Sequence, residues 1–359
     1  MNVVFGGIRS FFGVFLIGVV VVVPPLTGEE PAGESFGIYA MNIEPGYHAL
    51  GFSFLNPALA RATVGSSGAS GGILALGAEA AGAVGHWLAT HTGALFLEVV
   101  GSPGGGSGEP SGHRFEIDEK ATRAALAAGE DVVLDLKSPW NTWVGADLAG
   151  CEVEIIPHQT LGQLLPPETL HADMSFSRAD QAQLFRDGVF QSYYVLGEAG
   201  SFADWRKVGG VSSGSMSGLV IHPGEGVYFV RSKQSQGALS LAFAGRVRQG
   251  PFAQPLSAGI NFIAEGHPKT RSFVGRNALR GSFTGGFNFK QADQAQIPEG
   301  KGYVKDYLAS DCDSFSQWIE FGGNYASQND TPVFDFRHAV FLNRNLPDPA
   351  YRLAAPWLN

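Results

Sequence analysis

The sequence predicts an all-β protein made of two related antiparallel modules, sandwich-like or barrel-like, the first of which carries an inserted β subdomain. Two observations predict this: one stretch of sequence occurs twice, and the composition is unusual. Glycine accounts for 49 of the 359 residues and charged residues for 16%, well below the usual quarter. Low charge with abundant glycine, serine and phenylalanine is more typical of an extracellular β protein than of a helical cytosolic one.

The duplicated stretch begins at an Ala-Asp-Gln-Ala-Gln motif and ends at an arginine. Each residue of the second copy lies 113 positions after its counterpart, as Trp318 does after Trp205, and no gap is needed. A register of this length indicates a duplicated structural module. The matched positions are Asp180, Gln181, Trp205, Gly209, Gly210 and Arg231 in the first copy, and Asp293, Gln294, Trp318, Gly322, Gly323 and Arg344 in the second.

We predict structural roles for these matched residues, since a catalytic pair would not normally be copied into both modules. The two tryptophans should pack in the cores, where a large ring buries the most apolar surface. The two aspartates should fix a turn through side-chain hydrogen bonds. The two arginines would either be edge-strand charges that block association of sheets or partners of the repeated aspartates. A shared ligand site is the alternative.

Residues 1–28 have the features of a secretory signal. Arg9 is their only charge, Phe11–Val23 is an apolar run of the length of an h-region, and Pro24-Pro25 ends it. Cleavage near Gly28 is expected, and an uncleaved anchor is the alternative. We therefore expect an exported protein, extracellular, at the cell surface or periplasmic, with no membrane span after signal removal.

The mature chain is expected to divide into a first module (29–63 with 166–250), an inserted subdomain (64–165) and a second module (251–359). Pro45-Gly46 predicts a hairpin in the first module. Gly51–Leu55 resembles Gly259–Ile263, so both modules would begin with this strand. In the insert, Ala121–Ala128 predicts a short helix and Ile73–His91 is ambiguous between helix and strand. Its predicted strands are Ala94–Val100, Arg114–Asp118, Asp131–Leu136 and Cys151–Ile156.

Four further blocks of the sequence are Gly150–Pro166, Trp205–Gly210, Gly226–Arg231 and Pro255–Ile263. In these blocks the chain resembles a family of uncharacterised exported β-rich proteins found mainly in Verrucomicrobia. The chain departs from the family at Cys151, where Asp is usual, and at Gln159, where an aromatic residue is usual. The resemblance implies export and a β-rich fold, and it implies no activity.

Charge and cysteine content limit the possible partners. The formal net charge is −9, and no cluster of Lys or Arg occurs, which argues against nucleic acid and anionic membranes. The two cysteines, Cys151 and Cys312, would in an exported chain either form one disulfide between the halves or remain buried thiols. We expect no cofactor and no metal site.

Few motifs carry chemistry. Gly68–Gly72 fits Gly-x-Ser-x-Gly and leaves Ser70 as a candidate nucleophile. His86 and His91 are five residues apart, so they do not share a helix face. Asp311 and Asp313 could contribute to a surface calcium site, although the spacing of an EF-hand is missing.

The function expected from the sequence is that of an exported structural or adhesive surface or matrix protein without catalytic activity, whose partners would be other envelope or matrix components or glycans. One alternative is an extracellular carbohydrate-binding protein, because exposed aromatic rings can stack on sugars. Its candidate residues are Trp140, Trp143, Tyr193 and Tyr194. A serine hydrolase that uses Ser70 is the second alternative.

Overall fold

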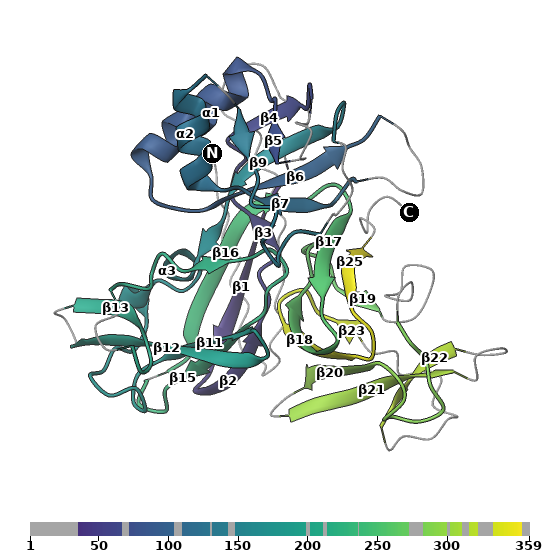
Figure 1. The fold of residues 1–359 in the computed structure, drawn as a ribbon. Coiled ribbons are helices and arrows are strands. Elements are labelled where there is room, and N and C mark those ends of the chain that lie inside the picture. Colours follow the sequence, from purple (N-terminus) through teal and green to yellow (C-terminus); the bar gives the residue numbers. More distant parts are fainter. Residues whose placement is uncertain are drawn as a thin grey trace, which may run out of the picture.

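The computed structural model describes residues 35–66, 72–103, 110–129, 131–142, 148–198, 202–210, 214–235, 237–272, 283–299, 302–310, 316–321 and 333–353. The predicted all-β class is confirmed: strands dominate and helices are short. None of the described sheets closes into a barrel. Among the described helices, none has the length and apolar character needed to span a membrane. Two β modules lie side by side, and the inserted segment sits above their junction (Figure 1).

The first module consists of a five-stranded sheet and a smaller three-stranded sheet. The five strands, in spatial order, are β13 (Phe202–Lys207), β12 (Val189–Glu198), β11 (Gln181–Arg186), β15 (Val227–Arg231) and β2 (Gly46–Leu50). The smaller sheet has the order β1 (Phe36–Ile43), β16 (Leu239–Val247) and β3 (Phe54–Leu55).

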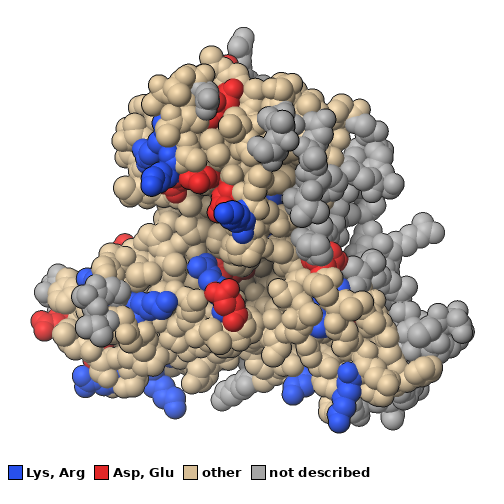
Figure 2. Space-filling view, viewed as in Figure 1, with Lys and Arg blue, Asp and Glu red and all other residues tan. Residues whose placement is uncertain are grey.

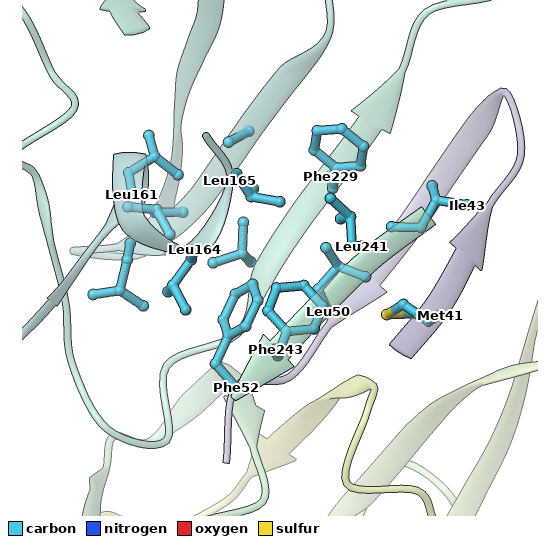
Figure 3. Close-up of a cluster of buried hydrophobic side chains, with 14 of the residues drawn as sticks. Met41, Ile43, Leu50, Phe52, Leu161, Leu164, Leu165, Phe229, Leu241 and Phe243 are labelled. Atoms are coloured by element: carbon cyan, nitrogen blue, oxygen red, sulfur yellow. The ribbon is translucent and has the colours of Figure 1, made fainter. Parts of the chain in front are cut away.

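Apolar side chains of both sheets share one core. Alternate residues of β1 are buried, including Met41 and Ile43, as the two-residue period of a strand requires. They meet Phe229 of β15 and Leu241 of β16 in the cluster shown in Figure 3. The module is therefore sandwich-like.

The inserted segment is a four-stranded sheet covered by two helices. Its order is β4 (Ala60–Thr63), β9 (Glu152–Pro157), β6 (Leu95–Gly101) and β7 (Arg114–Glu116), and β5 (Ile73–Leu74) pairs separately with β8 (Val132–Val133). The helices are α1 (Ala78–Thr90) and α2 (Glu119–Ala127). Ala80, Val84 and Leu88 of α1 are buried at four-residue spacing, which identifies most of the ambiguous stretch as an amphipathic helix.

The edges of the inserted segment differ by a few residues from the predicted range. β4 pairs with β9, so the sheet of the insert begins at Ala60. At the other end, β10 (Gln159–Thr160) pairs with β14 (Val220–Ile221), and the short helix α3 (Leu161–Leu164) packs in the first module's core. A 3₁₀ turn, η1, follows at Pro167–Thr169.

The second module has a sheet with the same strand order as the first. Its order is β22 (Ser316–Glu320), β21 (Gly302–Ser310), β20 (Gln294–Glu299), β24 (Ala339–Arg344) and β18 (Gly259–Ala264). Two further pairs are β17 (Phe252–Leu256) with β25 (Asp348–Leu353), and β19 (Arg271–Ser272) with β23 (Val333–Phe334).

Matched residues occupy matched places in the two large sheets. Val195 lies opposite Trp205, and Leu308, which is 113 positions after Val195, lies opposite Trp318. At the other side of the sheets, Arg231 faces Gly46 and Arg344 faces Gly259. The strand equivalent to β18 is therefore β2.

The predicted equivalence of Gly51–Leu55 with Gly259–Ile263 is accordingly wrong. Two short apolar runs follow each other here, and comparison of sequences alone matched the second run, which precedes a proline, instead of the first.

The contacts between the modules are reciprocal. Leu50 of β2 forms a bridge with His338 before β24, and Ile263 of β18 forms one with Glu225 before β15. The backbone N–H of Gly51 donates to Arg337 O at 2.9 Å, and that of Ala264 donates to Gly224 O at 2.8 Å. Each contact recurs with the two modules exchanged, so an approximate two-fold axis relates them, as in an isologous dimer interface.

Candidate metal centre

Two histidines and a glutamate that are far apart in the sequence meet at the base of the inserted segment. His158 Nε2 lies 2.6 Å from Glu116 Oε2, and His222 Nδ1 lies 3.2 Å from Glu116 Oε1. One potential ligand atom from each of the three side chains lies within 4.8 Å of the others. This group has the donors of a metal site.

Strand pairing brings the three residues together. Phe96 of β6 faces Glu116 on one side and Ile156 on the other, so the end of β7 and the end of β9 flank the same strand. Gln159 of β10 faces Ile221 of β14. Because the pair is antiparallel, the preceding residue, His158, and the following residue, His222, continue the same register. His158 is thus the residue at which the chain passes from the insert into the first module.

Aromatic rings and polar groups hold the centre in place. The ring of Trp140 stacks on His222, with centroids 4.1 Å apart and planes at 14°. The ring of Phe96 lies 4.7 Å from that of His158. The Glu116 backbone N–H donates to Asn141 Oδ1 at 2.8 Å, which fixes the end of β7.

The centre is nearly closed to water. The side chain of His158 has 0% exposure, that of Glu116 11% and that of His222 12%. Burial lowers the pKa of His222 to about 4, although its hydrogen bond with Glu116 acts in the opposite direction. Burial alone would raise the pKa of Glu116, but the facing His158 and His222 lower this pKa well below its usual range. At neutral pH, Glu116 is therefore charged and His222 is neutral, which are the forms that bind metals.

Chemically, this arrangement can either share protons or hold an ion. The Nε2–Oε2 separation of 2.6 Å is that of a hydrogen bond, whereas neighbouring ligands of a tetrahedral zinc ion lie about 3.3 Å apart, given bonds of about 2.0–2.1 Å. An ion would therefore replace the bridging proton and push the imidazole outward by less than about 1 Å. Among the described residues, none hydrogen-bonds the buried His158 Nδ1.

A cleft opens beside the centre, where the insert and the two modules meet. Its volume is about 560 Å³, and its wall includes Trp140, Arg186, Glu225 and Phe262. Arg186 binds Glu225 through two hydrogen bonds of 2.5 and 2.7 Å. Glu225 Oε2 also accepts the His222 backbone N–H at 3.0 Å. Glu225 therefore holds both Arg186 in the cleft wall and the backbone of His222 in the centre.

The repeated aspartates hold backbone in the same way in both modules. Asp180 Oδ1 accepts the Ser232 N–H at 2.7 Å and Oδ2 accepts the His171 N–H at 2.9 Å. Asp293 makes the matching bonds with the backbone N–H groups of residues 345 and 284, at 2.7 and 2.9 Å. Both carboxylates are buried. They join the end of one strand to the loop before another.

The repeated glutamines and tryptophans are also matched. Gln181 Nε2 donates to Phe176 O at 2.9 Å, and Gln294 Nε2 donates to the equivalent carbonyl, Phe289 O, at 2.7 Å. Trp205 and Trp318 are buried in separate cores. Trp205 Nε1 donates to Leu165 O at 2.8 Å, so α3 is anchored to the sheet by this ring.

The repeated arginines do not lie on edge strands, so that prediction is wrong. Arg231 lies on β15 and Arg344 on β24, and each of these strands has a neighbour on both sides. Both arginines are buried, so a positive residue repeated in the sequence does not mark an exposed edge strand here. Arg344 Nε lies 3.0 Å from Asp293 Oδ2, which is the alternative partnership predicted from the sequence. Arg231 donates to Gly237 O at 2.8 Å.

The structure describes the repeated glycines only in the first module. Gly209 has a φ of 74° in the turn after β13, a conformation that favours glycine, and Gly210 follows it. Gly322 and Gly323 lie outside the described residues.

The three candidate sugar-binding aromatics that the structure describes are not brought together. Tyr193 is buried in the first core, whereas its neighbour Tyr194 is half-buried and contacts Phe176, because successive residues of a strand face opposite ways. Trp140 is half-buried on the cleft wall. Trp143 lies outside the described residues.

Other predicted candidates stand apart from the centre. His86 is exposed on α1, and His91, at the end of that helix, stacks on Trp87. Cys151 is buried. Ser70, Asp311, Cys312 and Asp313 lie outside the described residues, so the hydrolase, calcium and disulfide predictions stay predictions.

Sequence reasoning did not single out Glu116, His158 or His222. The separation in sequence is 42 residues between Glu116 and His158 and 106 between Glu116 and His222, which no short metal-binding motif spans. The one available signal was a histidine that follows the apolar run Val153–Ile156 after a single proline.

No protein-family model matches this chain, and comparisons with curated proteins and with solved structures found no similar protein.

Proposed function

We propose that the protein is an exported structural or adhesive component of a cell surface or matrix, without catalytic activity. Two kinds of observation support this. Residues 1–28 have the charge, length and breaker pattern of a secretory signal. The repeated aspartates, tryptophans and arginines are buried, as residues that support a fold are.

The observation that carries the proposal is the repeated aspartate. A catalytic carboxylate needs access to a substrate, whereas Asp180 is buried and accepts from two backbone N–H groups and from Ser235 Oγ at 3.1 Å. Asp293 is equally buried, accepts from the matching backbone groups and faces Arg344. Duplication of such a unit enlarges a scaffold and adds no chemistry.

Fractionation of cells that express the full chain tests the proposal. We expect the protein in the extracellular, surface or periplasmic fraction. The double substitution Ile17→Asp and Val20→Asp, which breaks the apolar run, should keep it in the cytoplasm. Val189→Asp is the matched control, because it adds a charge at an exposed position of β12 and should leave export unchanged. Wild-type protein that remains in the cytoplasm would overturn the proposal.

A second candidate function, glycan binding, is favoured by the position of Trp140. This ring lines the cleft of about 560 Å³ beside the Arg186–Glu225 pair, and an aromatic ring beside charged hydrogen-bonding groups is suited to a sugar. A glycan array should show binding by the wild type and by Trp87→Ala, and loss of binding by Trp140→Ala. An array without signal above background would remove this candidate.

A further inference from the structure

We infer that Glu116, His158 and His222 bind one divalent transition-metal ion of the zinc class, and that this ion joins the inserted segment to the first module. The inference goes beyond the proposed function, since a scaffold of this kind does not require a metal. It rests on the geometry of three side chains that belong to different parts of the fold.

The donor set selects the class of ion. Two imidazole nitrogens with one carboxylate are suited to zinc and its neighbours in the first transition series. Calcium and magnesium prefer six or more oxygen ligands, and these three side chains offer only the carboxylate. The negative charge of the carboxylate partly neutralises a divalent cation, which favours retention of the ion in a buried site.

The burial of the centre gives a second, independent reason. His158 has no exposed side-chain surface, and within the described part of the chain its Nδ1 atom has no hydrogen-bond partner. The Nε2 atom of this ring, 2.6 Å from Glu116 Oε2, is the atom that would bind the ion, and the burial of the ring keeps bulk water away from that position.

The origin of the ligands shows what the ion does. Glu116 ends a strand of the insert, His222 follows a strand of the first module, and His158 lies between the two parts. An ion bound to all three would cross-link segments that otherwise meet through short strands and side chains. Three protein ligands leave one position of a tetrahedral ion open, which the small exposed fractions of Glu116 and His222 allow a water molecule to fill.

The test is calorimetric titration of zinc chloride into untagged, chelator-treated, full-length mature protein. We expect one equivalent of zinc to bind and the melting temperature to rise with zinc concentration. His222→Ala should lose both effects, and His222→Cys, which restores a zinc ligand, should recover binding. His86→Ala is the matched control, because it removes an exposed histidine on α1 and should bind as the wild type does.

Two results would overturn the inference: wild-type protein that binds no zinc, or a His222→Ala variant that binds one equivalent with unchanged affinity. If this variant does not fold, cobalt(II) added to the wild type decides the question. Absorption bands of a tetrahedral site with nitrogen and oxygen ligands are expected, and a spectrum like that of the aqueous ion contradicts the proposal. Export is not involved in either experiment, so failure here is distinct from failure of the proposed function.

Discussion

Asp180 and Asp293 each hold together two segments of backbone that are far apart in the sequence of their module. In both cases one oxygen accepts the N–H of the residue just after β15 or β24, and the other accepts an N–H of the loop nine residues before the aspartate. A buried carboxylate is stable in such a place because several N–H donors replace water. Because both aspartates make the same hydrogen bonds in their modules, an aspartate recurs at an offset of 113 residues.

Asp306 is a buried carboxylate without such support. It lies opposite Glu320 in the second sheet, and its Oδ2 atom has no hydrogen-bond partner among the described residues. Burial raises the pKa of Asp306 to about 7, and the charge of Glu320 acts in the same direction. Because the pKa in the folded state exceeds that in the unfolded state, the stabilising contribution is present below about pH 4 and is lost as the pH rises through about 7.

Asp306→Asn should therefore make the protein more stable than the wild type at pH 8 and about equally stable near pH 4. Melting temperatures measured at several pH values check this. Asp187→Asn, which changes an exposed residue in the turn between β11 and β12, should follow the wild-type pH profile. A wild-type advantage at pH 8 would contradict the role of burial at Asp306.

At the scale of elements, the short helix α3 shows how a few residues fix a connection. Thr160 and Gln163 form a capping box, in which the Thr160 side chain accepts the Gln163 N–H at 3.3 Å and Gln163 Oε1 accepts the Thr160 N–H at 2.9 Å. This cap directs Leu161 and Leu164 into the first module's core (Figure 3).

Thr160→Ala should lower the free energy of unfolding by about 0.5–2 kcal/mol, as is usual for loss of an N-cap. Thr160→Ser keeps the hydroxyl group and should retain most of the stability. Urea unfolding of the two variants and the wild type measures the difference. Equal losses in both variants would show that the methyl group, and not the cap, is what matters.

Elements with a strong pattern were predictable from the sequence. The insert's strands lie near their predicted ranges because apolar residues of β6 and β9 form short continuous runs, and α2 lies near Ala121–Ala128. The Ala-rich start of α1 was ambiguous because alanine and glycine give no clear period. The candidate metal centre could not be predicted, because the meeting of His158 with His222 depends on the pairing of two strands of two residues each.

At the scale of the whole molecule, two modules meet across an approximate two-fold axis and the insert lies above their junction (Figure 1). On the face shown in Figure 2, acidic and basic side chains form small scattered groups, without an extended patch of one sign. This face therefore offers no extended charged patch to a highly charged polymer.

The contact between the modules depends on small residues at matched positions. A Cβ atom at Gly226 would lie 2.6 Å from the Cβ atom of Ala339, which occupies the equivalent position of the second module, and 2.9 Å from the ring of Phe262. The two backbones can approach only because one member of this pair is glycine.

Gly226→Ala should destabilise the protein by about 1–3 kcal/mol, the usual effect of overpacking, and should increase cleavage between the modules in limited proteolysis. Gly218→Ala is the control, since a Cβ atom at Gly218 meets nothing within 4 Å. Unchanged stability and proteolysis in Gly226→Ala would mean that the modules are not held in this arrangement.

The two halves of the chain are built alike, and their matched residues support the fold. Thermal unfolding of Asp180→Asn and Asp293→Asn tests this claim most directly, because each substitution turns an amide donor toward backbone N–H groups that need an acceptor. We predict that each variant loses about 1–3 kcal/mol of stability, whereas the exposed-turn control Asp187→Asn stays close to the wild type. Wild-type stability in either buried variant would contradict the claim.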